Sequence, residues 1–426
     1  MVAQKENSSK GIRKNSVESV KVSTRSTRII RLPISIEEHK ESLKGRKNYV
    51  TFIENYIEKY PSLFPAAITE GFGVHDYLRS KKLDFGYYRI RVKKTGIVYR
   101  IYPCDVLPYM TGKAVDAQNG LLLLMYGVPI WLIVRCLGRN INFWQQLFLY
   151  FGTCSIVGST VKDSTKLPKN ITIDEKITWW NGREIYAAMV AGCNCILGNN
   201  LSQSEDEVGL TAAYERFKTE AQNVVADYSP TSCSIDGWAS SRKAITTLFP
   251  KVICILCFLH SVLKIRAVCK RDPERNVLMD KVWNVYKAKT INELDEKVAD
   301  LTVWTAANIT KESIKINVDK LCARKDKFAV TFEVPEGCRT TNMIDRTMRP
   351  FDKFLANRLY FHGHFATAQL TCAAFALCHN FAPFAPRTRS KNPKHANCRA
   401  DDLNGFSFRE NWLENLLVAT SRKGIW

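Results

Sequence analysis

The segment 233–260 constrains the fold of this chain most, because it predicts two buried strands joined by a short helix. Asp236 follows a run of small and β-branched residues and precedes a glycine, a pattern that places a carboxylate at the carboxyl end of a strand. Residues 240–248 predict a helix that ends at a Phe-Pro pair. The apolar run 252–259 is typical of a strand buried on both faces, and His260 closes it. The segment therefore predicts part of an α/β sheet with an acid and an imidazole near one edge.

The residues before this segment predict three more strands and a long helix. The strands are expected at residues 171–180, 184–191 and 194–201. The helix is expected to open at a capping box that begins at Ser204 and to run, with one apolar face, to about residue 225. The predicted order is β-β-β-α-β-α-β, with Asp174 on the first strand and Asp236 after the fourth.

The charge of the chain is strongly positive. It has 62 Lys and Arg residues against 41 Asp and Glu residues, a formal net charge of +21 over 426 residues. This excess indicates a polyanionic partner, either nucleic acid or an anionic membrane surface, with a merely solvated basic surface as the alternative. The apolar stretch 121–134 is interrupted by Pro129, and its roughly 15 residues fall short of the ~20 that span a bilayer. We therefore expect no membrane partner.

The 14 cysteines do not suit a small secreted disulfide framework. Most of them lie in apolar runs, as reduced core cysteines do. The first residues lack the apolar segment of a secretory signal. Together these features predict a cytoplasmic protein.

Residues 113–165 predict three short helices joined by glycine-containing turns. The helices are expected at 116–126, 129–137 and 142–151. This arrangement is typical of a helix-turn-helix whose third helix reads DNA. The candidate DNA-binding residues are Arg139, Asn142, Trp144 and Gln145. A plain helical packing unit is the alternative, because the third helix carries few cations.

The later part of the chain predicts an insertion followed by a return to the sheet. Residues 265–327 have a helical apolar pattern that is weakly linked to the sheet, which indicates an all-helical insertion. Residues 328–334 are expected to form a strand.

A third acid is expected on the helix that follows. The pattern places the N-cap of this helix at Thr341 or Asn342. Asp345 then lies on the first turn beside Arg346 and Arg349, where the positive end of the helix keeps a carboxylate ionised. An ordinary ion pair with Arg349 within the helix is the alternative.

Short motifs spread over the chain resemble those of one protein family. They are Asp174-Glu175-Lys176 with Trp179-Trp180, Asp236-Gly237-Trp238, Phe249-Pro250, Cys257-x-x-His260, Arg339-Thr340-Thr341-Asn342-Met343-Ile344-Asp345-Arg346, Tyr360-Phe361-His362-Gly363 and Asn380-Phe381-Ala382-Pro383. With these motifs the chain resembles bacterial insertion-sequence transposases of the DDE superfamily, in the branch related to Mutator-like transposases. The resemblance extends loosely from about residue 45 to the end and is strongest over 170–260 and 338–384.

The resemblance implies an α/β fold with an RNase H-like core. Its mixed five-stranded sheet would have the first and fourth strands as neighbours. The expected division is a disordered basic arm (1–32), a small α+β unit with a β-hairpin (33–112), a helix-turn-helix-like DNA-binding region (113–165), the first part of the core (166–264), a helical insertion (265–327), the second part of the core (328–384), and a basic linker with a C-terminal helix (385–426).

The resemblance also implies a catalytic site. Asp174, Asp236 and Asp345 would be the metal-binding triad, holding two Mg²⁺ or Mn²⁺ ions, for which carboxylate oxygens are suitable ligands. Further residues would support the site or contact DNA, namely Cys257, His260, Arg339, Asn342 and Arg346.

Two features leave alternatives open. The usual third acid of the family is glutamate, whereas this chain has an aspartate, Asp345. Triads made only of aspartates are known in mariner-type relatives. Glu333 and Glu336 are the nearby substitutes. A structural histidine is the alternative for His260, and Cys254-x-x-Cys257-x-x-His260 would suggest zinc, although a fourth ligand is not evident.

The activity that the resemblance implies is metal-dependent DNA cleavage and strand transfer at the ends of a mobile element. The chemistry is phosphodiester hydrolysis followed by transesterification. The expected partners are double-stranded DNA, as element ends and as target, and further copies of the chain in a homodimer or higher oligomer associated with the nucleoid. The alternative is a catalytically inactive DNA-binding protein derived from a transposase.

Overall fold

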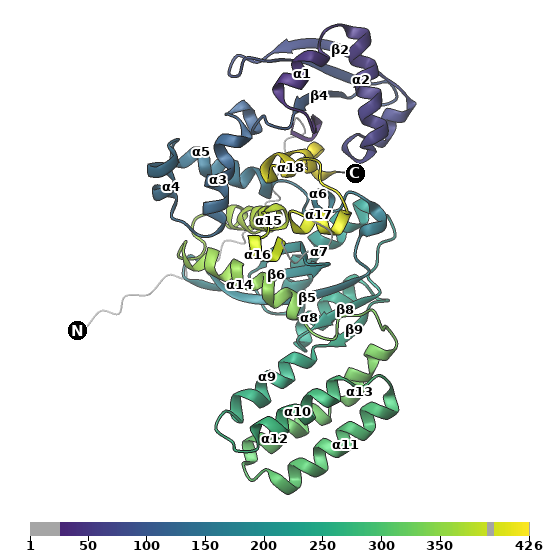
Figure 1. The fold of residues 1–426 in the computed structure, drawn as a ribbon, viewed down its shortest axis with the longest axis vertical. Helices are drawn as coiled ribbons and strands as arrows, with labels where there is room; N and C mark the ends of the chain where they lie inside the picture. The colour runs from purple at the N-terminus through teal and green to yellow at the C-terminus, as the bar shows by residue number, and fades with distance from the viewer. Residues whose placement is uncertain (1–25, 390–395, 426) are drawn as a thin grey trace, which may run out of the picture.

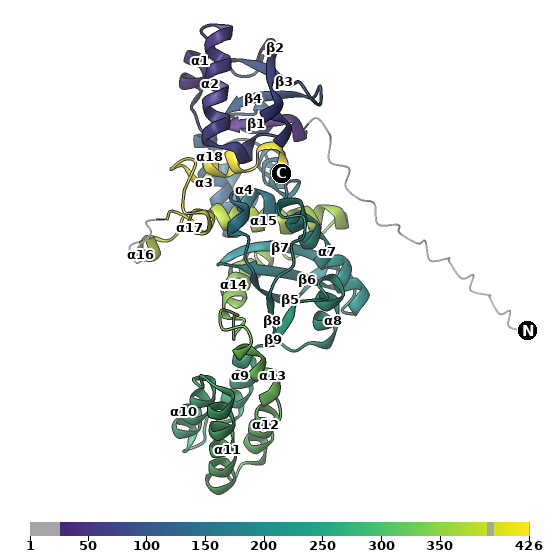
Figure 2. The same cartoon turned by 90° about the vertical axis from the view of Figure 1, so that its right-hand side faces the viewer.

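The computed structural model describes residues 26–389 and 396–425 (Figure 1). These residues form an α/β structure with two mixed sheets. The molecule is elongated, with a small four-stranded sheet at one end, a five-stranded sheet in the middle and a group of helices at the other end (Figures 1 and 2).

The last residues of the expected disordered arm are ordered. Residues 1–25 of that arm lie outside the described residues. β1 (Ile29–Leu32) pairs in parallel with β4 (Val98–Pro103), and the Arg31 side chain within it is buried. Arg31 donates its backbone N–H to Ser421 Oγ at 2.9 Å, and its guanidinium donates to the Tyr150 hydroxyl at 3.1 Å. The prediction missed β1 because its partners lie far along the chain.

The four-stranded sheet has the order β1-β4-β3-β2. Its other elements are β2 (Phe72–Arg79), β3 (Gly86–Val92), α1 (Ile36–Ser42) and α2 (Arg46–Lys59). The expected hairpin is confirmed, because β3 and β4 pair antiparallel with Arg89 opposite Arg100.

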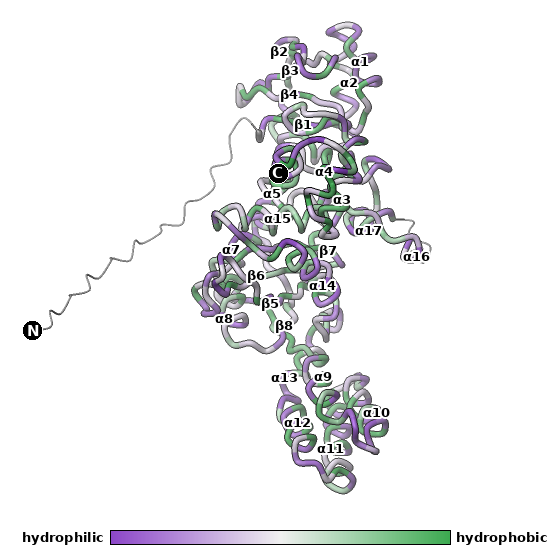
Figure 3. Tube along the Cα trace, turned by 90° about the vertical axis from the view of Figure 1, so that its left-hand side faces the viewer, coloured by the Kyte–Doolittle hydropathy of each residue, from purple (hydrophilic) through white to green (hydrophobic). Residues whose placement is uncertain are grey.

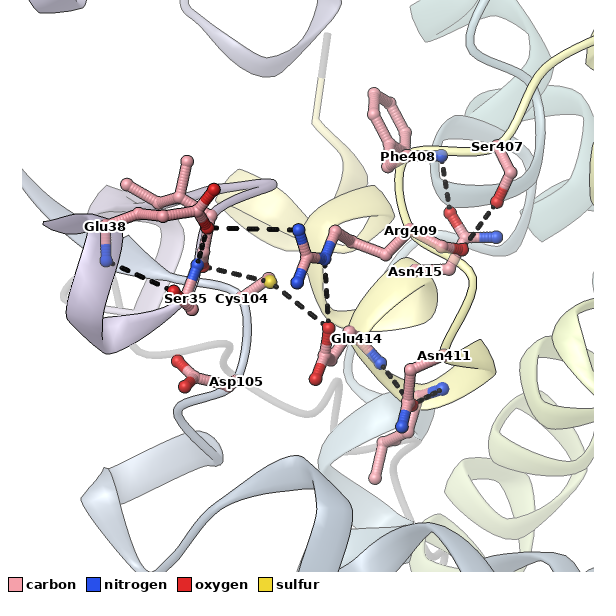
Figure 4. A network of polar contacts seen from close by, with 12 residues as sticks. Ser35, Glu38, Cys104, Asp105, Ser407, Phe408, Arg409, Asn411, Glu414 and Asn415 are labelled. Carbon is pink, nitrogen blue, oxygen red and sulfur yellow. Dashed lines mark hydrogen bonds and ion pairs between the residues drawn. The ribbon is translucent and has the colours of Figure 1, made fainter.

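The C-terminal part of the chain is bonded to this sheet unit (Figure 4). Arg409 pairs with Glu414 at 3.1 Å and with Glu38 of α1 at 4.0 Å. The Cys104 thiol, directly after β4, lies 3.6 Å from the Glu414 carboxylate. Segments that are more than 300 positions apart in the chain are therefore joined by one polar network.

Four helices follow the small sheet. They are α3 (Ala114–Met125), α4 (Ile130–Leu137), α5 (Ile141–Gly152) and α6 (Ile156–Thr160). The three expected helices are confirmed as α3, α4 and α5. α5 packs against α15 (Phe365–Phe381) so closely that a Cβ at Gly152 would lie 2.1 Å from the Leu370 carbonyl oxygen. One face of the expected recognition helix is therefore occupied by the core.

The five-stranded sheet has the order β7-β6-β5-β8-β9. Its strands are β5 (Asn170–Trp180), β6 (Arg183–Gly192), β7 (Cys195–Ser202), β8 (Ser232–Ile235) and β9 (Ile253–Leu256). The two helices between strands are α7 (Glu207–Val224) and α8 (Ala239–Leu248). The predicted order β-β-β-α-β-α-β is confirmed, and β5 and β8 are parallel neighbours.

The N-terminus of α7 differs from the prediction. Its N-cap is Asp206, whose carboxylate accepts the Gly209 N–H at 2.7 Å, and not Ser204. Ser204 Oγ instead accepts the Asp206 N–H at 3.2 Å, so the serine shapes the turn before the helix.

The last strand of the sheet is shorter than predicted. β9 ends at Leu256, and α9 (Phe258–Val268) starts two residues later. The Cys257 N–H donates to the Ile235 carbonyl at 2.8 Å, which is the last bond to β8. Phe258 packs in the core of the helical insertion, so the apolar run serves two cores in succession. Hydrophobicity alone does not separate a buried strand from a buried helix.

The segment in which a helical insertion was expected consists of helices and has a hydrophobic core of its own. Its further helices are α10 (Arg275–Tyr286), α11 (Ile291–Asn308), α12 (Glu312–Cys322) and α13 (Lys325–Ala329). The strand expected at 328–334 is wrong, because α13 and the 3-10 helix η6 (Val330–Phe332) occupy these residues. Hydrophobic and hydrophilic residues alternate along these helices in Figure 3, as in helices with one buried face.

The remaining helices connect the insertion to the end of the chain. They are α14 (Asn342–Ala356), α15, α16 (Pro386–Arg389), α17 (Arg399–Asn404), α18 (Trp412–Ala419) and the 3-10 helix η7 (Ser421–Gly424). α15 is buried along most of its length and belongs to a core shared with α2, α3, α5 and α18. Part of the expected basic linker, residues 390–395, lies outside the described residues. Within the described ranges, none of the helices has the length and apolar character needed to cross a bilayer.

Candidate active site

The first two candidate acids lie on neighbouring parallel strands. Thr172 of β5 is opposite Ser234 of β8, and this is the last pair in their register. Asp174 lies two residues after Thr172 on β5, and Asp236 lies two residues after Ser234, directly past the end of β8. The negative charge of Asp236 raises the pKa of Asp174, which is consistent with two acids that lie close together. The sheet therefore brings together two acids from distant parts of the chain.

Each of these carboxylates is oriented by a backbone N–H group. Asp174 Oδ1 accepts the N–H of Glu175 at 2.9 Å, and Asp236 Oδ1 accepts the N–H of Trp238 at 2.8 Å. The turn after Asp236 depends on Gly237, which has a φ of +99°. A Cβ at Gly237 would also approach Leu256 Cδ1 to 2.8 Å, so both backbone conformation and space favour glycine.

The third acid comes from α14, which packs along β5 and β6. Lys176 of β5 pairs with Asp352 of α14 at 3.2 Å and helps to hold the helix there. Thr341, one of the two expected residues, is the N-cap, and its carbonyl accepts the Asp345 N–H at 3.1 Å. Asp345 is thereby presented on the first turn, towards the other two acids.

The three acids influence one another's protonation. Burial raises the pKa of Asp174 to about 7, and the negative charges of Asp236 and Asp345 contribute to the shift. Burial also raises the pKa of Asp345, against the opposing effects of His260, Thr341 and Arg349. The site therefore holds more negative charge than its surroundings compensate, a condition that favours binding of a proton or a cation.

His260 is the basic group beside these acids. It lies on the first turn of α9, and its Nδ1 is 3.4 Å from Thr341 Oγ1. A hydrogen bond with Cys257 raises the pKa of His260 to about 9, and although burial opposes this shift, the negative charges of Asp174 and Asp236 add to it. At neutral pH, His260 is therefore an imidazolium.

Thr341 connects His260, Cys257 and α14. Its Oγ1 lies 3.2 Å from Cys257 Sγ, and its N–H donates to the same sulfur at 3.2 Å. Burial raises the pKa of Cys257, but hydrogen bonds from His260 and Thr341 outweigh this effect and hold the pKa below its usual value. The sequence identified Thr341 only as a helix cap; no pattern signalled its contacts with Cys257 and His260.

A fourth acid, Glu175, was not identified as a candidate. Its carboxylate accepts the Tyr214 hydroxyl at 2.6 Å, and burial raises its pKa to about 7. Because side chains alternate along a strand, Glu175 points to the opposite face from Asp174. It supports the packing of α7 on the sheet.

The other predicted site residues are placed differently. The Arg339 guanidinium lies over the rings of Tyr286 and Phe332, at 4.7 Å and 5.6 Å from their centres, and so contacts the insertion. Asn342 and Arg346 are exposed on α14. The exposed alternative acids, Glu333 and Glu336, are not among the groups that shift the pKa of Asp174 or Asp345.

The candidate DNA-contacting residues lie at and after the α4–α5 turn. Asn142 and Gln145 are exposed, and the Arg139 guanidinium stacks 5.2 Å from the centre of the Phe143 ring. The prediction for Trp144 is wrong, because its side chain is fully buried and its indole donates to the Gly138 carbonyl at 3.1 Å. Its large apolar ring closes the core beside Gly120.

The donor atoms of the acid site suit a hard divalent cation, because they are carboxylate oxygens. Across residues 26–389 and 396–425, however, no three His, Cys, Asp or Glu side chains are arranged so that they could hold a metal ion. The same finding leaves Cys254, Cys257 and His260 without the arrangement of a zinc site within these residues.

Comparisons of the chain with known protein families and with curated proteins find no match.

Proposed function

We propose that the chain is a metal-dependent DNA transposase with an RNase H-like catalytic core. The observation that carries the proposal is the parallel pairing of β5 and β8, which brings Asp174 near Asp236, together with the approach of Asp345 on α14. The order β7-β6-β5-β8-β9 and the interrupting helical insertion support the same reading.

The three aspartates would be the catalytic residues, and their carboxylates would have to rearrange from the described geometry to hold two Mg²⁺ or Mn²⁺ ions. When bound, these ions supply activation of water or of a DNA 3′-hydroxyl and stabilisation of the leaving oxygen. The Glu175 and Trp238 N–H groups orient two of the carboxylates. His260, as an imidazolium, offsets their mutual repulsion. The substrate would be double-stranded DNA, as element ends and as target, bound by two or more copies of the chain within the nucleoid.

A catalytically inactive DNA-binding descendant is the second candidate. It is favoured by one observation, that the three carboxylates do not form a complete ligand arrangement within the described residues. The two candidates share the DNA-binding property and differ in cleavage.

The test is cleavage of DNA that carries the element's own ends, with Mg²⁺ or Mn²⁺. The variant Asp236→Asn should lose cleavage and retain DNA binding, whereas the exposed-site control Asp227→Asn should cleave like the wild type. In a thermal-shift assay, Mg²⁺ should raise the Tm of the wild type and not that of Asp236→Asn, because ligand binding stabilises only a folded state that has the site. Unchanged cleavage in Asp236→Asn would exclude the transposase proposal; binding without cleavage in the wild type would favour the second candidate.

A further inference from the structure

A hollow of about 460 Å³ lies between the helices α3, α4 and α5 and the end of α14. Its wall includes the aromatic side chains of Trp131, Phe148 and Tyr360 and the polar side chains of Gln145 and Asn357. We call it the aromatic hollow. Its volume lies within the range of about 300–1,000 Å³ that is usual for small-ligand pockets.

The aromatic hollow exposes large apolar side chains to solvent. Trp131 is 61% exposed, Tyr360 is 41% exposed and Leu359 is 74% exposed, while Phe148 forms a buried floor. Exposed aromatic side chains gathered around a concavity are typical of a binding site.

The loop that carries Tyr360 is held in a strained conformation. Leu359 and Tyr360 have φ values of +54° and +69°, a region that costs free energy for residues other than glycine. The loop is nevertheless fixed, because His362 Nε2 bonds to the Leu359 carbonyl at 2.7 Å and the Phe361 N–H donates to the Trp179 carbonyl at 3.0 Å. Tyr360 is therefore positioned before any ligand arrives.

The aromatic hollow is connected to the acid site by two rigid elements. α14 carries Asp345 on its first turn and reaches the hollow at its end, eleven residues later at Ala356, which corresponds to about 16 Å along the helix. The second connection is β5, which carries Asp174 and receives the Phe361 bond at Trp179. At ~3.4 Å per stacked nucleotide, about five nucleotides span the distance along α14.

The charge of the hollow favours an anionic ligand. Arg358 contributes to its wall, and none of the described residues that line it is acidic. Arg135 is exposed on α4 four residues after Trp131, and so shares its helix face. The amides of Gln145 and Asn357 can both donate and accept hydrogen bonds, as the edge of a base requires.

We propose that the aromatic hollow binds one nucleobase that has left the DNA stack, on the DNA strand that passes the acid site. Trp131 and Tyr360 stack on the base, the amides of Gln145 and Asn357 bond to its edge, and Arg135 and Arg358 contact the adjoining phosphates. Stacking between bases and aromatic side chains is the usual way in which proteins hold unstacked bases. The inference rests on the proposed function only for the position of the DNA strand. Base binding itself requires no cleavage.

The test compares two fluorescein-labelled DNA duplexes that differ only in one unpaired thymine. Binding is measured by fluorescence anisotropy in EDTA, so that cleavage does not contribute. The wild type should bind the duplex with the unpaired base more tightly, by about 5- to 150-fold, as the strength of one base–aromatic stack implies. Trp131→Ala and Tyr360→Ala should lose this preference, and Trp131→Phe should keep most of it.

Tyr126→Ala is the control, because Tyr126, directly after α3, is 60% exposed but does not line the aromatic hollow. It should keep the preference. Equal binding of the two duplexes by the wild type, or an unchanged preference in Trp131→Ala, would overturn the inference. Reduced self-association of Trp131→Ala with an unchanged DNA preference would assign the hollow to a second copy of the chain and would also overturn it.

The same assay separates this inference from the proposed function. Asp236→Asn should keep the preference for the unpaired base although it is expected to lose cleavage. A wild type that prefers the unpaired base and never cleaves DNA would support base binding and reject catalysis. A wild type that cleaves DNA but shows no preference for the unpaired base would support catalysis and reject base binding.

Discussion

Asp174 illustrates how burial and repulsion at one residue set both stability and chemistry. Its pKa of about 7 lies above the ordinary value of 3.8, first because the side chain is buried and then because Asp236 and Asp345 are near. A carboxyl group whose pKa is raised on folding contributes stability that is present at low pH and is lost as the pH rises through the folded-state pKa. At neutral pH and above, the acid cluster therefore destabilises the fold when no cation is bound.

Replacing Asp174 by Asn should consequently increase stability while it removes activity. The free energy of unfolding of Asp174→Asn, relative to the wild type, should rise between pH 4 and pH 7, by up to about 4 kcal/mol for a shift of roughly three pKa units. Chemical denaturation at several pH values in EDTA measures this difference. The exposed Asp227→Asn is measured alongside as the control. A difference between Asp174→Asn and the wild type that does not change with pH would contradict the explanation.

His260 has the complementary behaviour. Its pKa is raised from 6.5 to about 9, chiefly by the Cys257 hydrogen bond, so its stabilising effect should be complete below pH 6.5 and lost as the pH rises through about 9. The imidazole NMR signals of the wild type should titrate near pH 9, and the stability difference from His260→Gln should disappear above that pH. The exposed His75 serves as the control site. Titration of His260 near pH 6.5 would mean that the Cys257 contact does not form.

At the scale of elements, the contact between α5 and α15 depends on a residue without a side chain. Gly152→Ala would place a Cβ 2.1 Å from the Leu370 carbonyl oxygen, an atom that a rotamer change cannot move. Despite the better helix propensity of alanine, the variant should be less stable by about 1–3 kcal/mol, as is usual for overpacking. Thermal unfolding measures the effect, with Gly73→Ala as the control because no atom lies within 4 Å of its added Cβ. Equal stability of the two variants would show that the helices can separate without cost.

Most elements could be predicted from the sequence where a local pattern determines them. The order of strands around Asp174 and Asp236 is confirmed because period-two alternation, glycine turns and a long amphipathic helix are local signals. β1 and the start of α9 were missed because their conformation depends on partners elsewhere, namely β4 for Ile29–Leu32 and the insertion core for Phe258. The candidate site follows the same division. The strand acids could be located, whereas the link from Cys257 through Thr341 to His260 depends on tertiary contacts.

At the scale of the whole molecule, the positive charge should dominate the salt dependence of DNA binding. The 62 basic side chains outnumber the 41 acidic ones by 21, so ion pairs within the chain cannot neutralise all of them. If six or more phosphates are contacted, log Kobs should fall with log salt concentration with a slope of about −5 or steeper. Fluorescence anisotropy at several salt concentrations measures this slope. A flat dependence would show that the basic surface is only solvated.

The bonds between β1 and η7 have a consequence for synthesis of the chain. Arg31 and Ser421 exchange two hydrogen bonds across 390 positions of sequence, and the Ser155 N–H also donates to the Lys423 carbonyl. At a ribosome rate of about 5–20 residues per second, the N-terminal sheet emerges roughly 20–80 s before the segment that covers its first strand. During that interval β1 lacks the contacts that η7 makes with it in the complete chain. Chaperones are therefore expected to bind this edge of the sheet until η7 has been synthesised.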